Sequence, residues 1–287
     1  MRRHHAPIGI LFLLPALASA LEDPFDATLD GTHWQSSVPL NGSKVSCPLE
    51  DSLATDGTVL ELVYPGPTSP RKYGPRWSTA LETVDRRGFG SYEARLKPAA
   101  ARSSEGVVSA FFTYFNDGTD YDGDGIADNS EIDFEFLAAE PSILYLTVWT
   151  DYENVDGLER FYHTARRIDL RTGQVWETEL GYEGEYGHLE EIAPLEWSVP
   201  GFTASDAYRT YGFDWQANQV VFWMDAEDGS GPHILWDLQG APDLQIPTVE
   251  AFAMINLWHN QYHWHTGKPA LPPSQPASHR VDRVSVP

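Results

Sequence analysis

Short apolar runs alternate with turn residues along this chain, and most of the runs fit the two-residue period of a β-strand. Val, Ile, Leu, Phe, Tyr and Trp fill the runs, whereas Gly, Pro, Asn and Asp separate them. This pattern favours half-buried strands joined by turns. The predicted strands are Thr58–Val63, Ser91–Leu96, Val107–Tyr114, Glu131–Leu137, Ile143–Trp149, Tyr208–Trp215, Val220–Met224, Val249–Leu257 and Val281–Val286.

The same pattern argues against long helices. No segment keeps the 3.6-residue period of an amphipathic helix, and Pro is scattered along the chain. Tyr211–Trp215 and Val220–Met224 flank Gln-Ala-Asn-Gln, which predicts a hairpin. The apolar run Val107–Tyr114 fits a central strand of a sandwich. We therefore predict an all-β fold, a sandwich of two packed antiparallel sheets.

The least strand-like stretch runs from Leu158 to Ala207. It is rich in Glu and Gly and contains Pro194 and Pro200. A segment this long without a strand pattern is commonly functional or mobile. We leave two interpretations open, a wall over a binding cleft or an insertion that takes no part in the site.

The first 20 residues have the pattern of a secretory signal peptide. Arg2 and Arg3 precede an apolar stretch, Ile8–Leu17, and Ala18-Ser-Ala20 is a small-residue cleavage site. We therefore expect a secreted protein, extracellular or periplasmic, with a single domain over residues 21–287 that includes the insertion at about 158–207. Cys47 is the only cysteine, so no internal disulfide can form, and it is predicted as a small core residue.

The charge of the chain narrows its partners. Asp and Glu number 42 against 19 Lys and Arg, for a formal net charge of −23. Such a surface repels nucleic acid and anionic lipid, so we expect neither as a partner. A neutral or cationic ligand is favoured, and the charge is also explained by solubility alone. We expect a monomer.

Three carboxylates share one predicted strand. In Glu131–Phe136 (EIDFEF), the acids Glu131, Asp133 and Glu135 alternate with large apolar residues, so an extended strand separates the two groups onto opposite faces. Like charges in one row repel, and their crowding raises at least one pKa. Glycosidic bond cleavage requires such separated pKa values. The alternative is a solvated acidic face on an ordinary strand.

A second acidic motif lies just before this strand. Aspartates at 120, 122, 124 and 128, with Gly125 at a sharp turn, resemble calcium loops of the EF-hand and thrombospondin-repeat kind. The twelfth position of that pattern falls on Glu131. Because a carboxylate held by a cation is a poor nucleophile, we expect calcium on Asp120, Asp122, Asp124 and Asp128 with Glu131 free. The alternative is an acidic turn without metal.

Five segments, in order, resemble those of glycoside hydrolase family 16. They are Gly88–Pro98, Val107–Tyr114, Glu131–Leu137 (EIDFEFL), Tyr211–Trp215 and Met254–Trp258. The resemblance covers about Tyr73 to Val286, without the Leu158–Ala207 stretch. The uninterrupted E-x-D-x-E form is similar to that of bacterial 1,3-1,4-β-glucanases and plant xyloglucan enzymes.

The resemblance implies a curved β-jelly roll with a concave glycan-binding sheet, and hydrolysis with retention of anomeric configuration. Glu131 would be the nucleophile, Glu135 the general acid/base, and Asp133 the neighbour that tunes the nucleophile. The Cα atoms of Glu131 and Glu135 lie ~13 Å apart on a straight strand, whereas retaining enzymes hold their carboxyls ~5–5.5 Å apart. We therefore predict that the strand bends and the two carboxyls converge. No cofactor is required for this chemistry, and a structural calcium ion is possible.

Aromatic side chains suit a sugar cleft, because the apolar face of a pyranose stacks on an indole. The predicted substrate-binding residues are Tyr114, Trp149, Trp215, Asn256, Trp258 and Trp264, with Trp215 and Trp264 as the stacking platforms. His259, His263 and His265 are spaced poorly for a metal, and we interpret them as hydrogen-bonding or solvated. The resemblance also implies a convex-side calcium site through Asp282.

The most favoured function is an endo-β-glycanase acting on a β-glucan of the 1,3-1,4 type. Thr147 and Glu82 stand where the bacterial enzymes usually carry Asn and Arg, so the glucan subsite contacts at these two positions depart from the resemblance. Two alternatives stay open. One is a non-catalytic, calcium-dependent, lectin-like sandwich, which the three intact acids disfavour, and the other is a transglycosylase on xyloglucan or another glucan.

Overall fold

The computed structural model describes residues 20–25, 29, 31–37, 45–46, 53–55, 59–64, 66, 77–178, 181–182, 189–226 and 229–287. Strands and turns make up this part of the chain, which contains no helix. The all-β prediction is confirmed. The signal-peptide prediction and Cys47 fall outside the described residues. No helix among the described residues is long and apolar enough to cross a membrane.

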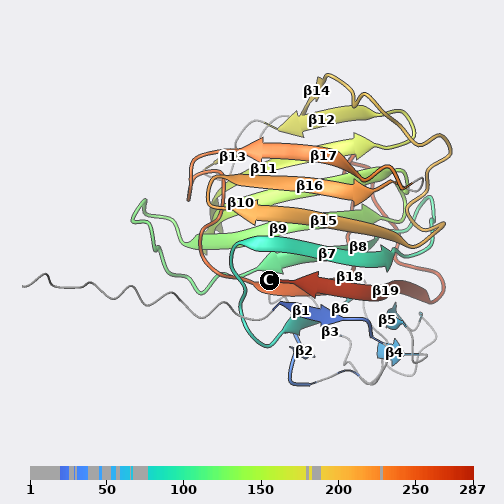
Figure 1. Ribbon diagram of the computed structural model, residues 1–287, viewed down its shortest axis with the longest axis horizontal. Coiled ribbons are helices and arrows are strands. Elements are labelled where there is room, and N and C mark those ends of the chain that lie inside the picture. Colours follow the sequence, from blue (N-terminus) through green and yellow to red (C-terminus); the bar gives the residue numbers. More distant parts are fainter. Residues whose placement is uncertain are drawn as a thin grey trace, which may run out of the picture.

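The strands form two large sheets (Figure 1). An eight-stranded sheet runs in the order β17-β16-β15-β7-β19-β5-β4, and β1 pairs with β19. Its strands are β1 (Leu21–Asp23), β4 (Leu53–Thr55), β5 (Leu60–Tyr64), β7 (Gly90–Lys97), β15 (Arg209–Gln216), β16 (Gln219–Asp225), β17 (Pro232–Gln239) and β19 (Ala277–Val286).

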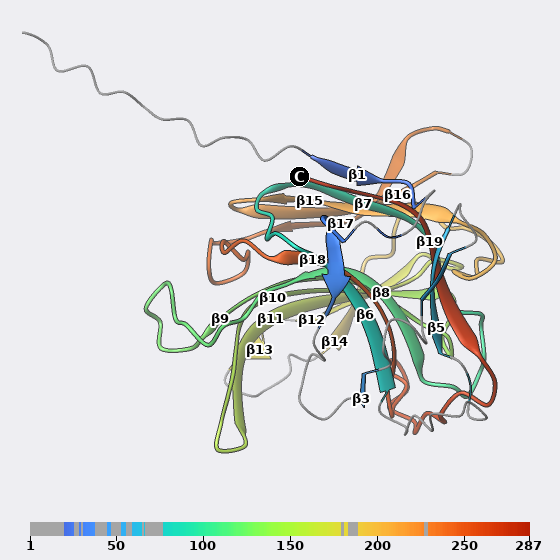
Figure 2. The same cartoon turned by 90° about the horizontal axis from the view of Figure 1, so that it is seen from below.

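An eleven-stranded sheet runs in the order β14-β12-β11-β10-β9-β8-β18-β6-β2, with β13 on β11 and β3 on β6. Its strands are β2 (Trp34–Ser36), β3 (Val45–Ser46), β6 (Trp77–Thr83), β8 (Val107–Tyr114), β9 (Asp128–Leu137), β10 (Ile143–Val155), β11 (Leu158–Asp169), β12 (Gln174–Thr178), β13 (Gly181–Tyr182), β14 (Leu189–Ile192) and β18 (Phe252–His259). Seen edge-on, this sheet curves so that its outer face is concave (Figure 2).

The core lies between the two sheets and explains the alternation read from the sequence. On β9, Ile132 and Phe134 are fully buried. The Phe134 ring lies 5.3 Å from that of Phe222 and 5.7 Å from that of Tyr211, both on the opposite sheet. Each such side chain contributes about 1.5–3 kcal/mol on burial. Burial of this face fixes the register of β9 and turns its acids outward, because a slip of one residue would exchange the two faces.

The predicted hairpin is present. β15 and β16 pair from Tyr211 opposite Met224 to Gln216 opposite Gln219, so the turn consists of two residues, Ala217 and Asn218. Gly212 lies within this hairpin with no room for a side chain, because a Cβ there would meet the Trp223 ring at 2.3 Å.

The prediction for Leu158–Ala207 is wrong in part, because its first half forms regular strands. β11 pairs with β10 along its whole length, and β12 and β14 extend the same sheet. Phe161 and Ile168 of β11 are fully buried, whereas Glu159 is exposed and Arg166 and Arg167 are half-buried. Charged side chains on the cleft side of β11 hid its strand pattern. The stretch therefore widens the concave sheet.

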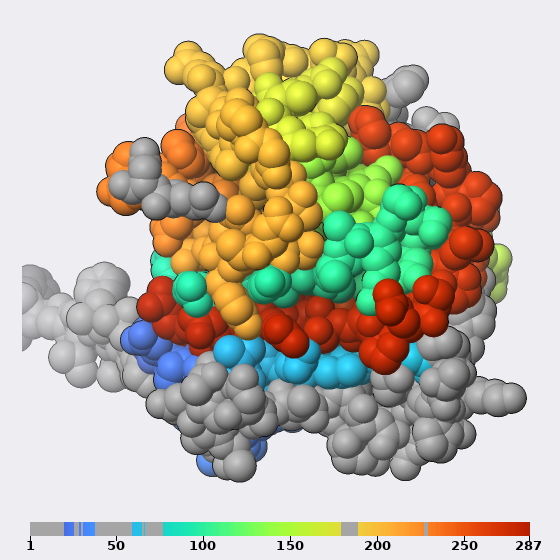
Figure 3. Space-filling view, turned by 90° about the vertical axis from the view of Figure 1, so that its right-hand side faces the viewer, coloured from blue at the N-terminus to red at the C-terminus, as the bar shows by residue number. Residues whose placement is uncertain are grey.

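One end of the sandwich is closed by two connections that lie against each other. Residues 98–106, between β7 and β8, and residues 260–276, between β18 and β19, are in contact in Figure 3, coloured teal and red. The amide of Gly106 donates to the Leu271 carbonyl at 3.0 Å, and the Asn260 amide donates to the Gly106 carbonyl at 2.7 Å. A Cβ on Gly106 would lie 1.9 Å from the Asn260 oxygen. This close contact fixes the loop that carries Trp264.

Candidate active site

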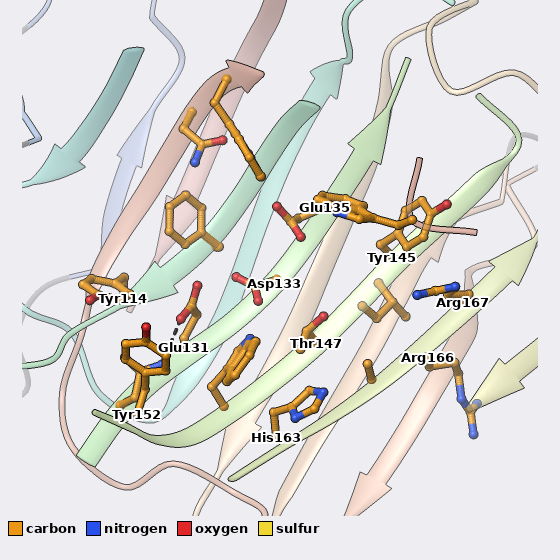
Figure 4. Close-up of a pocket in the computed structure, with 18 of the residues that line it drawn as sticks. Tyr114, Glu131, Asp133, Glu135, Tyr145, Thr147, Tyr152, His163, Arg166 and Arg167 are labelled. Atoms are coloured by element: carbon orange, nitrogen blue, oxygen red, sulfur yellow. Dashed lines mark hydrogen bonds between the residues drawn. The ribbon is translucent and has the colours of Figure 1, made fainter. Parts of the chain in front are cut away.

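The three acids of β9 stand on the concave face of the eleven-stranded sheet. Glu131, Asp133 and Glu135 all line one open cavity of about 500 Å³ and point to the same side of the strand (Figure 4). Their arrangement follows from the two-residue period of β9, whose intervening side chains are buried in the core. A row of carboxylates therefore forms the floor of a cleft.

Strand β10 places one partner opposite each acid. Trp149 pairs with Glu131, Thr147 with Asp133, and Tyr145 with Glu135. Cross-strand neighbours share a face of the sheet, and all three β10 residues line the cavity. The sequence did not indicate Tyr145 or Thr147 as substrate-binding residues. Both could have been found from this alternation once Trp149 was chosen.

The Glu131 end of the cleft holds polar and aromatic side chains. The Asn129 side-chain amide donates to Glu131 Oε2 at 2.8 Å. Tyr114 lines the cavity beside Glu131, and burial together with the charges of Glu131 and Tyr152 raises its pKa to about 12. Tyr114 therefore keeps its hydroxyl proton at neutral pH and can donate a hydrogen bond.

Asp133 is the most buried of the three acids, with 5% of its surface exposed. Burial raises its pKa well above the ordinary value, the charges of Glu131 and Glu135 raise it further, and the Trp149 side chain lowers it in part. An Asp133 that keeps its proton can donate a hydrogen bond. It can thus stand between two ionisable glutamates without adding a third negative charge.

The Glu135 end is formed by three aromatic side chains. The Trp264 ring lies 5.0 Å from Tyr145 and 5.9 Å from Trp258, measured between ring centroids. The Tyr145 hydroxyl donates to Glu140 Oε2, which orients the Tyr145 ring. Asn256 also lines the cavity, and its carboxamide oxygen is buried without a hydrogen-bond partner among the described residues. Aromatic faces and an available acceptor are suited to sugar rings and hydroxyls.

Further cavity residues come from β11 and the far end of β10, and no motif in the sequence pointed to them. His163 stacks on Trp149 at 4.5 Å, and burial lowers the pKa of His163 to about 4, so this imidazole is neutral at neutral pH. Tyr152 and Arg167 also line the cavity. They were missed because β10 changes register between Trp149 and Asp151 and because β11 was not predicted.

The prediction for Trp215 is wrong. Trp215 lies on β15 of the eight-stranded sheet, is 1% exposed and packs in the core between the sheets. Its indole NH donates to the Pro247 carbonyl at 2.8 Å, and its ring contacts Phe89 and Tyr92. It was mistaken for a sugar platform because sequence alone does not tell which sheet a strand joins. Of the two proposed platforms, Trp264 alone reaches the cleft.

This difference predicts opposite effects for two tryptophan substitutions. Trp215→Ala should lower the free energy of unfolding by about 3–5 kcal/mol, because it opens a core cavity and removes a buried hydrogen bond. Trp264→Ala should raise KM for a polysaccharide while leaving unfolding within about 1 kcal/mol, because Trp264 is only partly buried. Denaturant unfolding and steady-state kinetics check both. Equal stability losses would contradict the placement of Trp264.

The predicted metal ligands fall in two places. Asp120, Asp122 and Asp124 form the one group among the described residues that could hold a metal, with ligand oxygens within 4.8 Å of one another. Asp128 is buried at the start of β9, where its Oδ2 accepts the Tyr121 amide at 2.5 Å. Asp282 instead forms an ion pair with Arg95 at 2.5 Å. The structure therefore gives the convex-side calcium site no support, because Arg95 already balances that charge.

The three histidines of the 259–265 segment do not form a metal group. The His259 ring is within hydrogen-bond distance of the Leu271 carbonyl, 3.0 Å from Nε2 to oxygen. The His265 ring packs on Trp176 at 4.7 Å, and His263 is buried. Their spacing along the loop separates them in space.

Comparisons with known proteins agree with this geometry. The family model described as "Glycosyl hydrolases family 16" matches residues 43–165, which include the three acids of β9. A beta-glucanase of Bacillus subtilis (strain 168) is 28% identical over 258 residues, 87% of this chain and 81% of the relative.

Two solved structures share the fold. A Bacillus licheniformis beta-glucanase superimposes with a TM-score of 0.58 at 20% identity, covering 94% of this chain and 98% of the other. A Crh5 transglycosylase gives 0.54 at 15% identity, covering 94% and 84%. The jelly-roll sandwich is thus common to them and to this chain. The matched segment carries the very acids that stand together in the cleft, so the chain resembles glycoside hydrolase family 16, and the comparisons support a glycoside hydrolase.

Proposed function

We propose that this protein is a retaining endo-β-glucanase that cleaves internal bonds of a β-glucan, most favourably one of mixed 1,3-1,4 linkage. One observation carries the proposal: Glu131, Asp133 and Glu135 line the floor of a cleft that continues past them on both sides. Trp149 and Tyr152 lie toward the Glu131 end, whereas Trp258 and Trp264 lie toward the Glu135 end. Binding surface on both sides of the acids favours attack within a chain.

The proposed reaction is a double displacement. The Glu131 carboxylate attacks the anomeric carbon while Glu135 gives its proton to the departing glycosidic oxygen, which forms a covalent glycosyl ester and releases one half of the chain. Glu135, now a carboxylate, removes a proton from water, and that water attacks the same carbon and frees Glu131. Two inversions retain the configuration. The step requires carboxyls ~5–5.5 Å apart, so convergence of Glu131 and Glu135 stays a prediction.

Asp133 supports this cycle as a positioning residue. Burial and the charges of Glu131 and Glu135 raise the pKa of Asp133, which favours its protonated form. A proton on Asp133 stabilises Glu131 as an anion and as a leaving group in the second step. The hydrogen bond from Asn129 to Glu131 acts in the same direction.

Similarity to the beta-glucanase of Bacillus subtilis supports a β-glucan as the substrate, and the E-x-D-x-E spacing, which resembles that of bacterial 1,3-1,4-β-glucanases, supports mixed linkage. Thr147, opposite Asp133, lines the cleft at a position where the resemblance leads us to expect Asn. Thr147 therefore bears on the choice of linkage, whereas the chemistry depends on the three acids of β9. Transfer to a sugar hydroxyl instead of water would follow from the same intermediate, as in a transglycosylase.

A substrate panel tests the proposal. Release of reducing ends is measured on mixed-linkage glucan, laminarin, xyloglucan and agarose, with Glu131→Gln as the inactive control. We expect the largest rate on mixed-linkage glucan, with a rapid fall in viscosity from internal cleavage. Product chains longer than the substrate would favour transfer, and binding without cleavage on every glycan would favour a lectin.

We also propose that the enzyme acts outside the cytoplasm. The support is the basic, apolar and small-residue pattern of the first 20 residues. Fractionation of a producing cell, with detection of the mature N-terminus, tests this; a full-length chain retained in the cytoplasm would contradict it.

A further inference from the structure

The connection between β8 and β9 projects from one end of the sandwich as the green loop at the left of Figures 1 and 2. We call residues 117–128 the aspartate loop. Its exposed acids Asp120, Asp122 and Asp124 bring ligand oxygens within 4.8 Å of one another. Exposed acidic turns of this kind are common without an ion, so the cluster alone does not define a site.

A buried carboxylate lies where this loop meets the sheet. Asp151 of β10 pairs with Asp128, just past the register change after Trp149, and is 0% exposed. Neither of its oxygens has a hydrogen-bond partner among the described residues. The adjacent Thr150 hydroxyl donates to the Leu244 carbonyl at 3.2 Å. A buried carboxylate left without a donor or a counter-ion is costly, and native proteins rarely retain one.

The charges that act on Asp151 come from the loop. Burial raises the pKa of Asp151 to about 8, the nearby Thr150 side chain lowers it in part, and the negative charges of Asp124, Asp128 and Asp122 raise it further. The pairing of Asp151 with Asp128 places Asp151 at the base of the aspartate loop. A cation among these carboxylates would offset their mutual repulsion and would let Asp151 ionise.

The loop is attached to β10 and β11 at the level of Asp151. The Tyr152 amide donates to the Ala127 carbonyl at 2.9 Å, and the Asn116 side chain donates to the Tyr152 carbonyl at 2.7 Å. Arg160 of β11 donates to the Gly125 carbonyl and to Glu153, both at 2.8 Å. Arg160 thus holds the loop through its backbone, and its carboxylate partner is Glu153.

We propose that the aspartate loop and β10 together bind a divalent cation of the calcium type, with Asp120, Asp122, Asp124 and Asp128 from the loop and Asp151 as the ligand that closes the site. Asp151 takes the place that the calcium-loop pattern gives to Glu131. Glu131 turns into the cleft, where it accepts from Asn129, and so stays available for chemistry.

The donor set selects the class of metal. Every side-chain ligand is a carboxylate, which favours a hard cation over zinc or copper. Ca²⁺ accepts six to eight oxygens in a flexible shell at about 2.3–2.6 Å, whereas Mg²⁺ demands a near-ideal octahedron at about 2.0–2.1 Å. A site assembled from a loop and a separate strand suits the more tolerant ion. Backbone carbonyl groups and water complete such a shell.

The site would connect the loop to the substrate cleft. Asp151 lies two residues from Trp149, and Asp128 lies three residues before Glu131. A bound cation would fix the Glu131 end of the cleft without touching substrate. We therefore expect it to affect stability and KM more than the chemical step.

Calcium titration of the full chain, after treatment with a chelator, tests the proposal. Isothermal titration calorimetry should show one calcium ion bound in this site. Asp151→Asn should weaken that binding by about 10- to 100-fold or more, because even residues that only contact metal ligands cost this much when they are changed. Asp156→Asn is the matched control, because Asp156 is an exposed turn residue with φ of 54° that Asn tolerates. Asp282→Asn separates this site from one on the convex face.

Thermal unfolding supplies a second readout that does not depend on activity. Millimolar calcium should raise the Tm of the wild type and of Asp156→Asn by ~5 °C or more, and should leave Asp151→Asn nearly unchanged. In chelator all three should melt within about 2 °C of one another, which shows that the variant folds. Should Asp151→Asn fail to fold, the exposed Asp124→Asn replaces it with the same expected losses.

Three results would overturn the proposal. The wild type could show neither heat of binding nor a shift in Tm with calcium. Asp151→Asn could bind calcium as tightly as the wild type. Binding could be lost in Asp282→Asn but kept in Asp151→Asn, which would place the ion on the convex face.

Discussion

Glu131→Gln is expected to lower kcat on every glucan by on the order of 10⁴-fold or more, as loss of a covalent nucleophile does in other enzymes. That factor corresponds to about 5.5 kcal/mol of transition-state stabilisation. Gln keeps the shape of the side chain, and its carbonyl oxygen can still accept from Asn129. The fold should therefore persist, with Tm within about 2 °C of the wild type. Reducing-end assays and calorimetry measure the two effects.

Chemical rescue assigns the nucleophile more sharply than loss of activity. With Glu131→Ala, azide can attack in place of the carboxylate, and a single displacement gives the α-glycosyl azide with a substrate that carries an activated leaving group. With Glu135→Ala, azide attacks the intermediate on Glu131 and gives the β-glycosyl azide. Exchange of the two products between the variants would reverse the roles assigned to the two residues.

Glu135→Ala should lower kcat on polysaccharide by about 10²- to 10⁴-fold, the usual contribution of general acid–base catalysis. On an aryl glycoside with a good leaving group, the first step needs little protonation and should be spared. The covalent intermediate then accumulates, because no base activates water, so KM should fall along with kcat. Pre-steady-state burst kinetics with the aryl substrate would reveal this accumulation.

The comparison between substrates is the control for Glu135. Glu140→Ala changes a nearby acid that holds the Tyr145 hydroxyl and is not opposite the reacting groups. It should affect both substrates to a similar extent. If Glu135→Ala also reduced both substrates equally, Glu135 would not be the proton donor.

Much of the site could be predicted from the sequence because β9 follows the simplest rule of a sheet. The two-residue period placed the acids on one face and Ile132 and Phe134 on the other, and the structure has this arrangement. The same period extends to β10, where Tyr145, Thr147 and Trp149 alternate with buried residues. Local pattern is enough wherever one face of a strand is buried and the other is not.

What the sequence missed depends on contacts between distant segments. Trp215 has the composition of a sugar platform, yet β15 joins the opposite sheet, and only the pairing of β15 with β7 shows this. Asp151 was not singled out, because its meaning comes from the register change after Trp149 and from the loop that folds against it. β11 was missed because the face of this strand that lines the cleft carries charged side chains, which interrupt the pattern expected of a strand.

The acids of the two candidate sites differ in how deeply they are buried and in what they would bind. Glu131 and Glu135 remain half-exposed in the cleft, where substrate can reach them, whereas Asp151 is sealed beneath the aspartate loop. Part of the net charge of −23 is therefore concentrated in two separate groups of carboxylates. One group of carboxylates carries proton and glycosyl transfer, and the other would hold a cation that fixes one end of the cleft.

The configuration of the first product tests the central claim most directly, because the claim is that Glu131 and Glu135 act on one acetal from opposite sides. Proton NMR spectra of mixed-linkage glucan, recorded within minutes of adding enzyme, show the new reducing end before mutarotation. The account predicts that the β-anomer forms first and that the α-anomer grows in later at the spontaneous rate. An α-anomer formed first would mean a single displacement by water and would contradict the account.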